Sequence, residues 1–306
     1  MTGILVQKII SLALIMTMGF LLVKLKILKA DDGKSLSTLT LYLIMPCMIL
    51  NAFQVDYTPD VKNGLFLTLA AALAMHLVLI IINFALKKIL RMDAVEQVSV
   101  MYSNAGNLVI PLVSAMLGKE WVIYTSGFIV VQLILIWSHG KSVLCEEKSF
   151  SFKKVLLNIN MIMIFIGVVL FFTGIRLPAL LQDTTATVGD MVGPVSMLVT
   201  GMLIGNMDIR KVFTYKRVWL VTFFRLIFVP LVMIVLLKFS GAAQLVPNGE
   251  KILLITLLAA TTPAASTITQ LANVYGKDAE YATSINVVTT LLCIVTIPLM
   301  VTIYQL

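Results

Sequence analysis

The stretch SNAGNLVIPL, Ser103 to Leu112, lies in the middle of an apolar segment that is long enough to cross a lipid bilayer. Pro111 has no N–H to donate and clashes with the carbonyl four residues earlier, while Gly106 permits unusual backbone angles. Asn104 is about nine residues into the segment, roughly 14 Å deep and near the bilayer midplane. The sequence therefore predicts a membrane helix that is interrupted at its centre.

Composition places the whole chain in a membrane. Of its 306 residues, 59% are hydrophobic and 12% are charged, and the mean hydropathy is +1.01. A soluble domain carries about 25% charged residues, so too little polar surface remains to cover a soluble particle. The net charge of +8 is spread over loops, so no nucleic-acid partner is expected. Three isolated cysteines and two separate histidines indicate neither a metal site nor a cofactor.

Ten apolar segments approach the roughly 20 residues that a transmembrane helix needs. Sixteen Lys and Arg residues fall in the odd-numbered loops between these segments and five in the others. Because positive residues concentrate in cytoplasmic loops, we expect a multi-pass plasma-membrane protein with both termini outside. The predicted spans are 4–24, 35–54, 64–86, 95–117, 121–138, 155–175, 186–206, 217–238, 251–271 and 280–303.

The two halves of the chain repeat each other weakly. The segment LGKEWVIYTS (Leu117–Ser126) matches YGKDAEYATS (Tyr275–Ser284) in Gly, Lys, an acid and Thr-Ser. Residues 1–150 and 151–306 would then be two repeats of five spans each, and an odd number of spans inverts the second repeat in the membrane. Inverted repeats with interrupted helices are typical of secondary transporters, although chance similarity between apolar segments is the alternative.

The second repeat contains a matching interruption, TTPAASTITQ (Thr261–Gln270), about ten residues into span 9 from the opposite face. Broken backbone survives in hydrocarbon only where it is buried or lines a cavity. Half-helix N-termini present free N–H groups and positive dipole ends, which suit an anion such as a carboxylate. Two proline kinks that only aid packing are the alternative. The predicted substrate-binding residues here are Asn104, Gly106, Asn107, Pro111, Thr261, Thr262, Pro263 and Ser266.

Three further polar residues lie within predicted spans. Arg225, about eight residues into span 8, is a functional candidate that attracts or balances an anion, or else snorkels or pairs structurally. Gln132, near the middle of span 5, either contacts substrate or packs between helices. Asp190, near the outer end of span 7, is a candidate for ion or proton coupling, with a helix cap as the alternative. No Asp or Glu lies near the centre of a span, which suits a negatively charged cargo.

These motifs resemble the auxin efflux carrier family, which includes plant PIN auxin transporters and bacterial malate and malonate permeases. The resemblance is carried by NAGNLVIPL (Asn104–Leu112), by SGFIVVQLILIW (Ser126–Trp137) and by the segment Pro263–Pro298. PIN proteins also have an Asn seven residues before the span-4 proline and a Gln at the Gln132 position. The chain departs from PIN in span 9 and lacks the long central loop, which favours the bacterial organic-anion permease branch.

The resemblance implies an all-α fold of ten helices in two inverted five-helix repeats. Spans 1, 2, 6 and 7 would form a scaffold, and spans 3–5 and 8–10 a transport domain in which broken helices 4 and 9 cross. It implies an elevator-type secondary transporter of small organic anions, a homodimer, with proton or sodium coupling left open. A sodium-coupled carrier like the bile acid:sodium symporters, or a channel or sensor, is the alternative. With no HExxH, GxSxG or acid cluster, we expect no enzyme activity.

Overall fold

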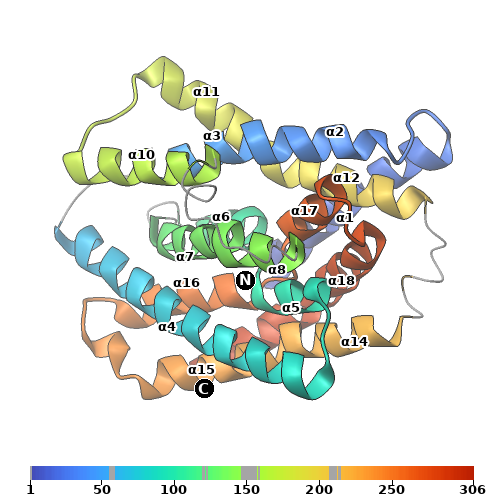
Figure 1. Ribbon diagram of the computed structural model, residues 1–306. Coiled ribbons are helices and arrows are strands. Elements are labelled where there is room, and N and C mark those ends of the chain that lie inside the picture. Colours follow the sequence, from blue (N-terminus) through green and yellow to red (C-terminus); the bar gives the residue numbers. More distant parts are fainter. Residues whose placement is uncertain are drawn as a thin grey trace.

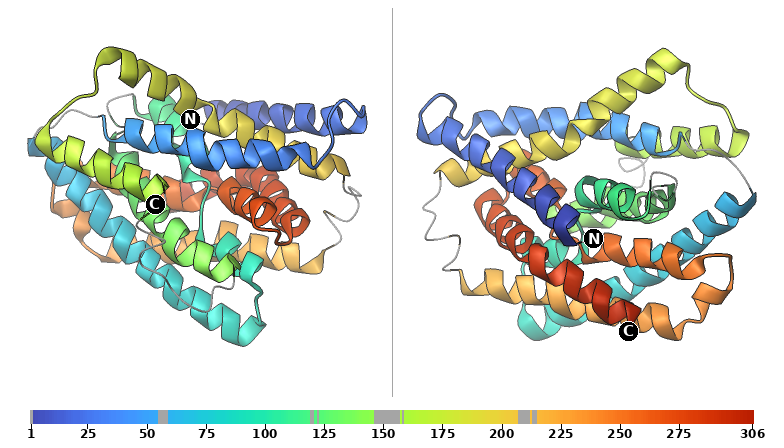
Figure 2. Two further views of the ribbon diagram at one scale, coloured as in Figure 1. Left: turned by 45° about the horizontal axis from the view of Figure 1, so that its top comes forward. Right: turned by 180° about the vertical axis from the view of Figure 1, so that it is seen from behind.

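A computed structural model shows a helical protein in which no strand occurs among the described residues (Figure 1). Figures 1 and 2 place α2, α3, α10 and α11 on one side of the molecule and α4, α14 and α15 on the other, with α6, α7 and α17 between them. The structure describes residues 2–54, 59–118, 121, 123–145, 157, 159–206, 212 and 215–306.

The described helices of the first half lie within residues 1–150, the first predicted repeat. They are α1 (Thr2–Lys24), α2 (Asp32–Leu39), η1 (Thr40–Ile44), α3 (Met45–Ala52), α4 (Pro59–Leu90), α5 (Ala94–Met101), α6 (Ala105–Met116), α7 (Ile123–Leu135), η3 (Ile136–Gly140) and α8 (Lys141–Cys145). Those of the second half are α10 (Ile159–Thr173), α11 (Ala179–Asp190), α12 (Val192–Asn206), α14 (Lys216–Phe223), η4 (Phe224–Phe228), α15 (Val229–Phe239), η5 (Ala242–Gln244), α16 (Gly249–Thr261), α17 (Ser266–Val274) and α18 (Ala279–Gln305).

Six helices in the described ranges are long and apolar enough to cross a membrane, and the chain is a multi-pass membrane protein. Two shorter apolar helices cover 13–24 and 159–173. Predicted spans 4 and 9 are each split, the first into α5 and α6 and the second into α16 and α17. The predicted interruptions are therefore present, while the number of ten crossings stays a prediction.

One face of α4 shows how the helices meet lipid. Leu77, Ile81 and Phe84 are 61%, 68% and 70% exposed, and they recur at helical spacing on one face. Met75 and Leu79 are buried on the opposite face. Exposed apolar side chains at this density would be unfavourable in water, but they are the surface that a bilayer requires. The same arrangement explains why sequence hydropathy alone identifies these helices.

Small residues bring α1 and α12 into close contact. A Cβ added to Gly19 would lie 2.2 Å from the carbonyl oxygen of Leu198, and one added to Gly201 would lie 1.9 Å from that of Met16. Lipid tails are as apolar as leucine, so membrane helices associate through such close packing rather than through expulsion of water. Glycine at these two positions therefore holds the first and seventh predicted spans together.

Proline explains two of the three π-helical turns among the described helices. Pro46 follows η1, and Pro230 follows η4. The ring of a proline clashes with the carbonyl four residues earlier, and a π turn there widens the helix and removes the clash without a full break. The turn at η4 also carries Arg225, so this local adjustment orients a fully buried arginine.

Candidate functional site

The two helix breaks lie against each other. Ser103 and Ala264 form an isolated antiparallel bridge between the two extended segments. The N–H of Asn104 donates to the Pro263 carbonyl at 2.8 Å, and the N–H of Ala265 donates to the Tyr102 carbonyl at 3.0 Å. Each break thus satisfies backbone groups of the other, which a low-dielectric interior requires. Four half-helices consequently meet at one point.

A side chain from a neighbouring helix holds each break. The Gln132 amide oxygen on α7 accepts from the N–H and the hydroxyl of Ser103, at 2.9 and 2.6 Å, and its Nε2 donates to the Ser103 carbonyl at 2.9 Å. On α18, Asn286 Nδ2 donates to the Ala264 carbonyl at 2.7 Å, and Thr289 Oγ1 accepts from the Ala264 N–H at 3.2 Å. Both crossing residues are therefore fixed by polar side chains from outside the broken helices.

Arg225 binds the carbonyl ends of the half-helices that precede the crossing. Its side chain is 1% exposed, which excludes snorkelling to the surface. The guanidinium donates to the Thr262 carbonyl at 3.0 and 2.8 Å, to that of Ala260 at 2.6 Å and to that of Val100 at 3.0 Å. These carbonyls lie at the C-terminal ends of α5 and α16, where the helix dipole is negative. The Arg225 guanidinium therefore binds the carbonyl ends of both half-helices.

The N-terminal ends of α6 and α17 face the crossing from the other side. Asn104 and Ala265 are the N-cap residues, and neither makes a side-chain cap hydrogen bond. Ser266 Oγ donates to Asn104 Oδ1 at 3.2 Å across the crossing. Because Arg225 compensates the two negative helix ends, the two positive ends dominate the field near Asn104 and Ser266.

A small cavity of about 30 Å³ opens beside these N-termini. On this measure one water molecule needs roughly 10–15 Å³, so this conformation leaves room for about two waters. Gln270, which is 1% exposed, joins α17 to α12 through a 2.7 Å bond from its Nε2 to Ser196 Oγ. The polar residues that line the cavity are Thr40, Ser103, Asn104, Gln132, Ser196, Thr267 and Gln270.

Several sequence-predicted site residues meet at this cavity. Asn104, Gly106 and Gln132 line it, and Ser266 contacts Asn104. The side-chain oxygen and nitrogen of Gln132 both bind Ser103, so these contacts hold the break.

Other predicted residues lie beside the cavity rather than in it. The hydroxyls of Thr261 and Thr262 donate to carbonyls of their own helix, three residues earlier, and Pro263 contributes its carbonyl to the crossing. Asp190 is exposed, ends α11 and does not line the cavity. The side chains of Asn107 and Pro111 lie outside the described part of the structure.

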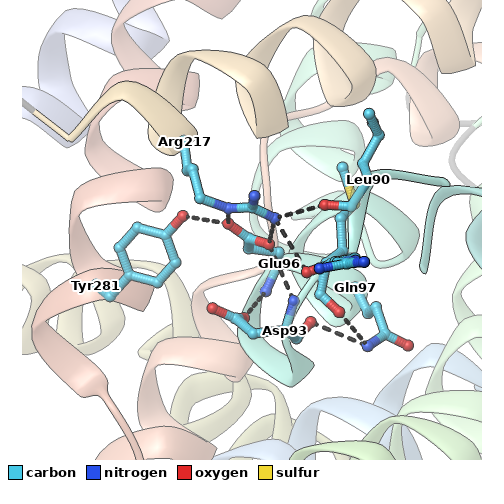
Figure 3. A network of polar contacts seen from close by, with 8 residues as sticks. Leu90, Asp93, Glu96, Gln97, Arg217 and Tyr281 are labelled. Carbon is cyan, nitrogen blue, oxygen red and sulfur yellow. Dashed lines mark hydrogen bonds and ion pairs between the residues drawn. The ribbon is translucent and has the colours of Figure 1, made fainter. Parts of the chain in front are cut away.

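Sequence reasoning missed a buried carboxylate near one end of the crossing helices. Figure 3 shows the Arg217 guanidinium and the Tyr281 hydroxyl pointing at the Glu96 carboxylate, which is fully buried. Tyr281 donates to Glu96 Oε1 at 2.7 Å, and the N–H of Asp93 donates to Oε2 at 3.0 Å. Glu96 thereby ties α5 to α14 and to α18.

The sequence held one signal for this network. Asp93 and Glu96 are spaced as a capping box, and Asp93 Oδ1 indeed accepts from the N–H of Glu96 at 2.8 Å. Partial burial raises the pKa of the Asp93 carboxyl, and the hydrogen bond from the Glu96 N–H acts in the opposite direction. The spacing predicts the start of a helix, but it carries no information about Arg217 or Tyr281.

A model of the family described as membrane transport protein matches residues 4–154 and 143–301, which together span nearly the whole chain. A search among curated proteins gave no match.

Proposed function

The chain belongs to the membrane transport protein family, the auxin efflux carrier family that its motifs resemble, and from this premise we propose that it is a secondary transporter of small organic anions. Its substrate would be a carboxylate such as malate, malonate or an auxin-like acid. Membership makes the chain a membrane transporter, and the proposal adds the cargo and the mechanism. It assigns the chain no enzymatic reaction.

One observation carries the proposal: two helix N-termini and two crossing backbone segments converge on one small cavity that both polar and apolar side chains line. Backbone N–H groups at helix N-termini favour negative charge without a fixed counter-charge in the site. Among the described residues that line the cavity, none is acidic or basic. A carboxylate would therefore be held by neutral donors such as Asn104, which suits a carrier that must also release it.

In this proposal Arg225 supports the site through the backbone. Its four side-chain hydrogen bonds go to backbone carbonyls, so its charge acts on the helix ends rather than on the substrate. With the negative ends compensated, the substrate carboxylate experiences the positive ends of α6 and α17. Arg225 would thus favour anions while lying on the far side of the crossing.

We further propose that transport follows an elevator-type movement of predicted spans 3–5 and 8–10 against spans 1, 2, 6 and 7. Three side-chain hydrogen bonds join the α17 region to the proposed scaffold, and they would break as the crossing moves. They connect Gln270 to Ser196 at 2.7 Å, Asn273 to Ser37 at 3.2 Å, and Tyr275 to Tyr42 at 3.1 Å. Plasma-membrane location, outside termini, a homodimer, and coupling to a proton or sodium belong to the same proposal.

A binding screen tests the cargo. Purified protein would be titrated with monocarboxylates, dicarboxylates and indole acids, with and without sodium, and at two pH values to detect proton coupling. We expect at least one carboxylate to bind and its amide analogue not to bind, because the amide carries no charge. Binding of the amide with equal affinity would contradict an anion site.

A flux measurement tests the carrier mechanism. Proteoliposomes loaded with the binding carboxylate should show saturable counterflow of labelled substrate. A channel on the same fold would give flux that follows the gradient and is not accelerated by substrate on the opposite side. Flux that only follows the gradient would show that the protein is a channel and not a carrier.

A further inference from the structure

A second and larger cavity lies apart from the crossing. Its volume is about 210 Å³, and it shares no lining residue with the small cavity beside the helix N-termini. Helices from both proposed domains form its walls, since α10 and the end of α3 face α4 and α7. The lining residues, apolar except for Ser126, are Phe53, Leu65, Leu69, Ser126, Gly127, Val130, Val168, Phe171 and Phe172.

All four walls contribute residues from the same end of the helix stack. Phe53 directly follows α3, and Leu65 lies in the second turn of α4. Ser126 is in the first turn of α7, and Phe172 is in the last turn of α10. Figure 1 shows that α4 begins and α10 ends on the same side of the molecule. The cavity therefore lies near one membrane face, which the distribution of Lys and Arg predicts to be the outer one.

An apolar cavity of this size favours an apolar occupant. An apolar cavity of about 150 Å³ stays dry and binds small apolar molecules, because water inside would lack hydrogen-bond partners. The lining helices also face lipid close by: Phe66 and Phe172 are 49% and 59% exposed, and Phe165, on the same helix as Phe172, is 70% exposed. A hydrocarbon chain can thus reach the cavity from the bilayer without crossing polar surface.

Polar groups at the same end suit the head of a phospholipid. Gln54 Oε1 accepts from the Leu177 N–H at 3.0 Å, which fixes the orientation of the amide. The opposite atom, Gln54 Nε2, is buried and has no acceptor among the described residues. Lys62 is exposed one helical turn before Leu65, and Arg176 adjoins Leu177. One buried donor and two cations suit ester and phosphate oxygens.

We propose that this cavity binds one acyl chain of an anionic phospholipid, with the headgroup at Gln54, Lys62 and Arg176. The lipid would fill the space between α10 on the proposed scaffold and α4 and α7 on the proposed transport domain. This site is separate from the substrate site, so it does not depend on which anion is carried. It would make the contact between the two domains sensitive to lipid composition.

Photolabelling tests the acyl-chain part. Wild-type protein in phosphatidylcholine vesicles would receive a trace of phosphatidylglycerol that carries a diazirine in one acyl chain. We expect labelled peptides from the end of α10 and the start of α4, at several times the level found around Ile81, which is 68% exposed to lipid. Val130→Phe, which fills the cavity, should lower this labelling at least fivefold. The matched change one turn on, Ile134→Phe, should leave it unchanged.

Competition tests the headgroup part without any variant. Unlabelled phosphatidylglycerol should displace the probe about tenfold better than phosphatidylcholine, because basic residues near the surface attract anionic lipids. The double variant Lys62→Gln, Arg176→Gln should remove most of this preference, and Gln54→Leu should reduce it. The control Lys238→Gln should leave the preference unchanged.

Two results would overturn the proposal. Labelling at the α10 end no stronger than around Ile81 would show that no lipid is held in the cavity. Equal competition by both lipids in the wild type would remove the anionic headgroup from the assignment. If Val130→Phe does not fold, lipid competition in the wild-type protein still tests the proposal.

Discussion

Among single residues, the polar side chains at the crossing have different roles at carbonyl ends and at N-terminal ends of helices. Arg225, Thr261 and Thr262 serve carbonyl ends, where donors are needed. Asn104 lies at an N-terminal end, where a substrate acceptor would be held. Buried polar residues are therefore structural at the carbonyl ends of the crossing, while the proposed substrate contact lies at an N-terminal end.

Asn104 offers the direct test of the substrate site. Its removal deletes a neutral donor, and a hydrogen bond to a charged group is worth roughly 1.5–3 kcal/mol. We expect Asn104→Ala to weaken carboxylate binding by about tenfold or more, since 1.4 kcal/mol corresponds to tenfold. Titration calorimetry on the variant and on the exposed-site control Lys238→Ala measures this. Equal affinities in both would move the substrate site elsewhere.

Arg225 offers a test of support through the backbone. Arg225→Ala leaves three buried carbonyls without this donor, and an unsatisfied buried group costs about 1–3 kcal/mol. We expect a clearly lower melting temperature and loss of uptake. Arg225→Lys should recover part of the stability and keep most of the substrate affinity, because the ammonium still reaches the carbonyl ends. If Arg225→Lys loses affinity but keeps wild-type stability, the guanidinium contacts the substrate instead.

At the scale of elements, short half-helices depend on their neighbours. An eight-residue helix such as α5 is too short to be stable alone, so packing and polar contacts must hold it. Glu96 provides such a contact, because it links α5 to α14 through Arg217 and to α18 through Tyr281. The network lies at the N-terminal end of α5, whereas the crossing lies at its C-terminal end.

A double-mutant cycle tests this network. Arg217→Ala removes the partner of a buried carboxylate, and breaking a buried pair from one side is more destabilising than removing both charges. We expect Arg217→Ala to melt at a lower temperature than the double variant Arg217→Ala, Glu96→Gln. The neighbouring exposed change Lys216→Ala should have little effect. Additive effects of the two single changes would mean that the charges do not stabilise each other.

At the scale of the whole molecule, orientation in the membrane decides which cavity meets which solution. The Lys and Arg distribution predicts cytoplasmic odd-numbered loops and outside termini. The lipid cavity would then lie toward the outer face, and the Glu96 network toward the cytoplasm.

Thiol labelling tests this topology. Cysteines introduced singly at Asp31 and at Asn248, both exposed, should react from opposite faces with an impermeant reagent. The background should lack Cys47, Cys145 and Cys293, so that only the new thiol reacts. Reaction of both positions from one face would contradict the predicted topology, since an odd number of crossings separates them.

The class of protein and the approximate places of the helix breaks follow from local patterns in the chain. Long apolar runs identify membrane helices, and the polar residues near Asn104 and Pro263 mark the interruptions, because these effects act within one or two turns of the chain. Pro111, in contrast, lies inside α6 and not at the break, so it does not open the helix near Asn107. The partners of the buried polar side chains depend on how distant helices pack. Arg225 reaches Val100 across 125 residues, and Arg217 reaches Glu96 across 121. A buried polar group takes whichever partner the packing of distant helices brings near, and no local pattern records that choice.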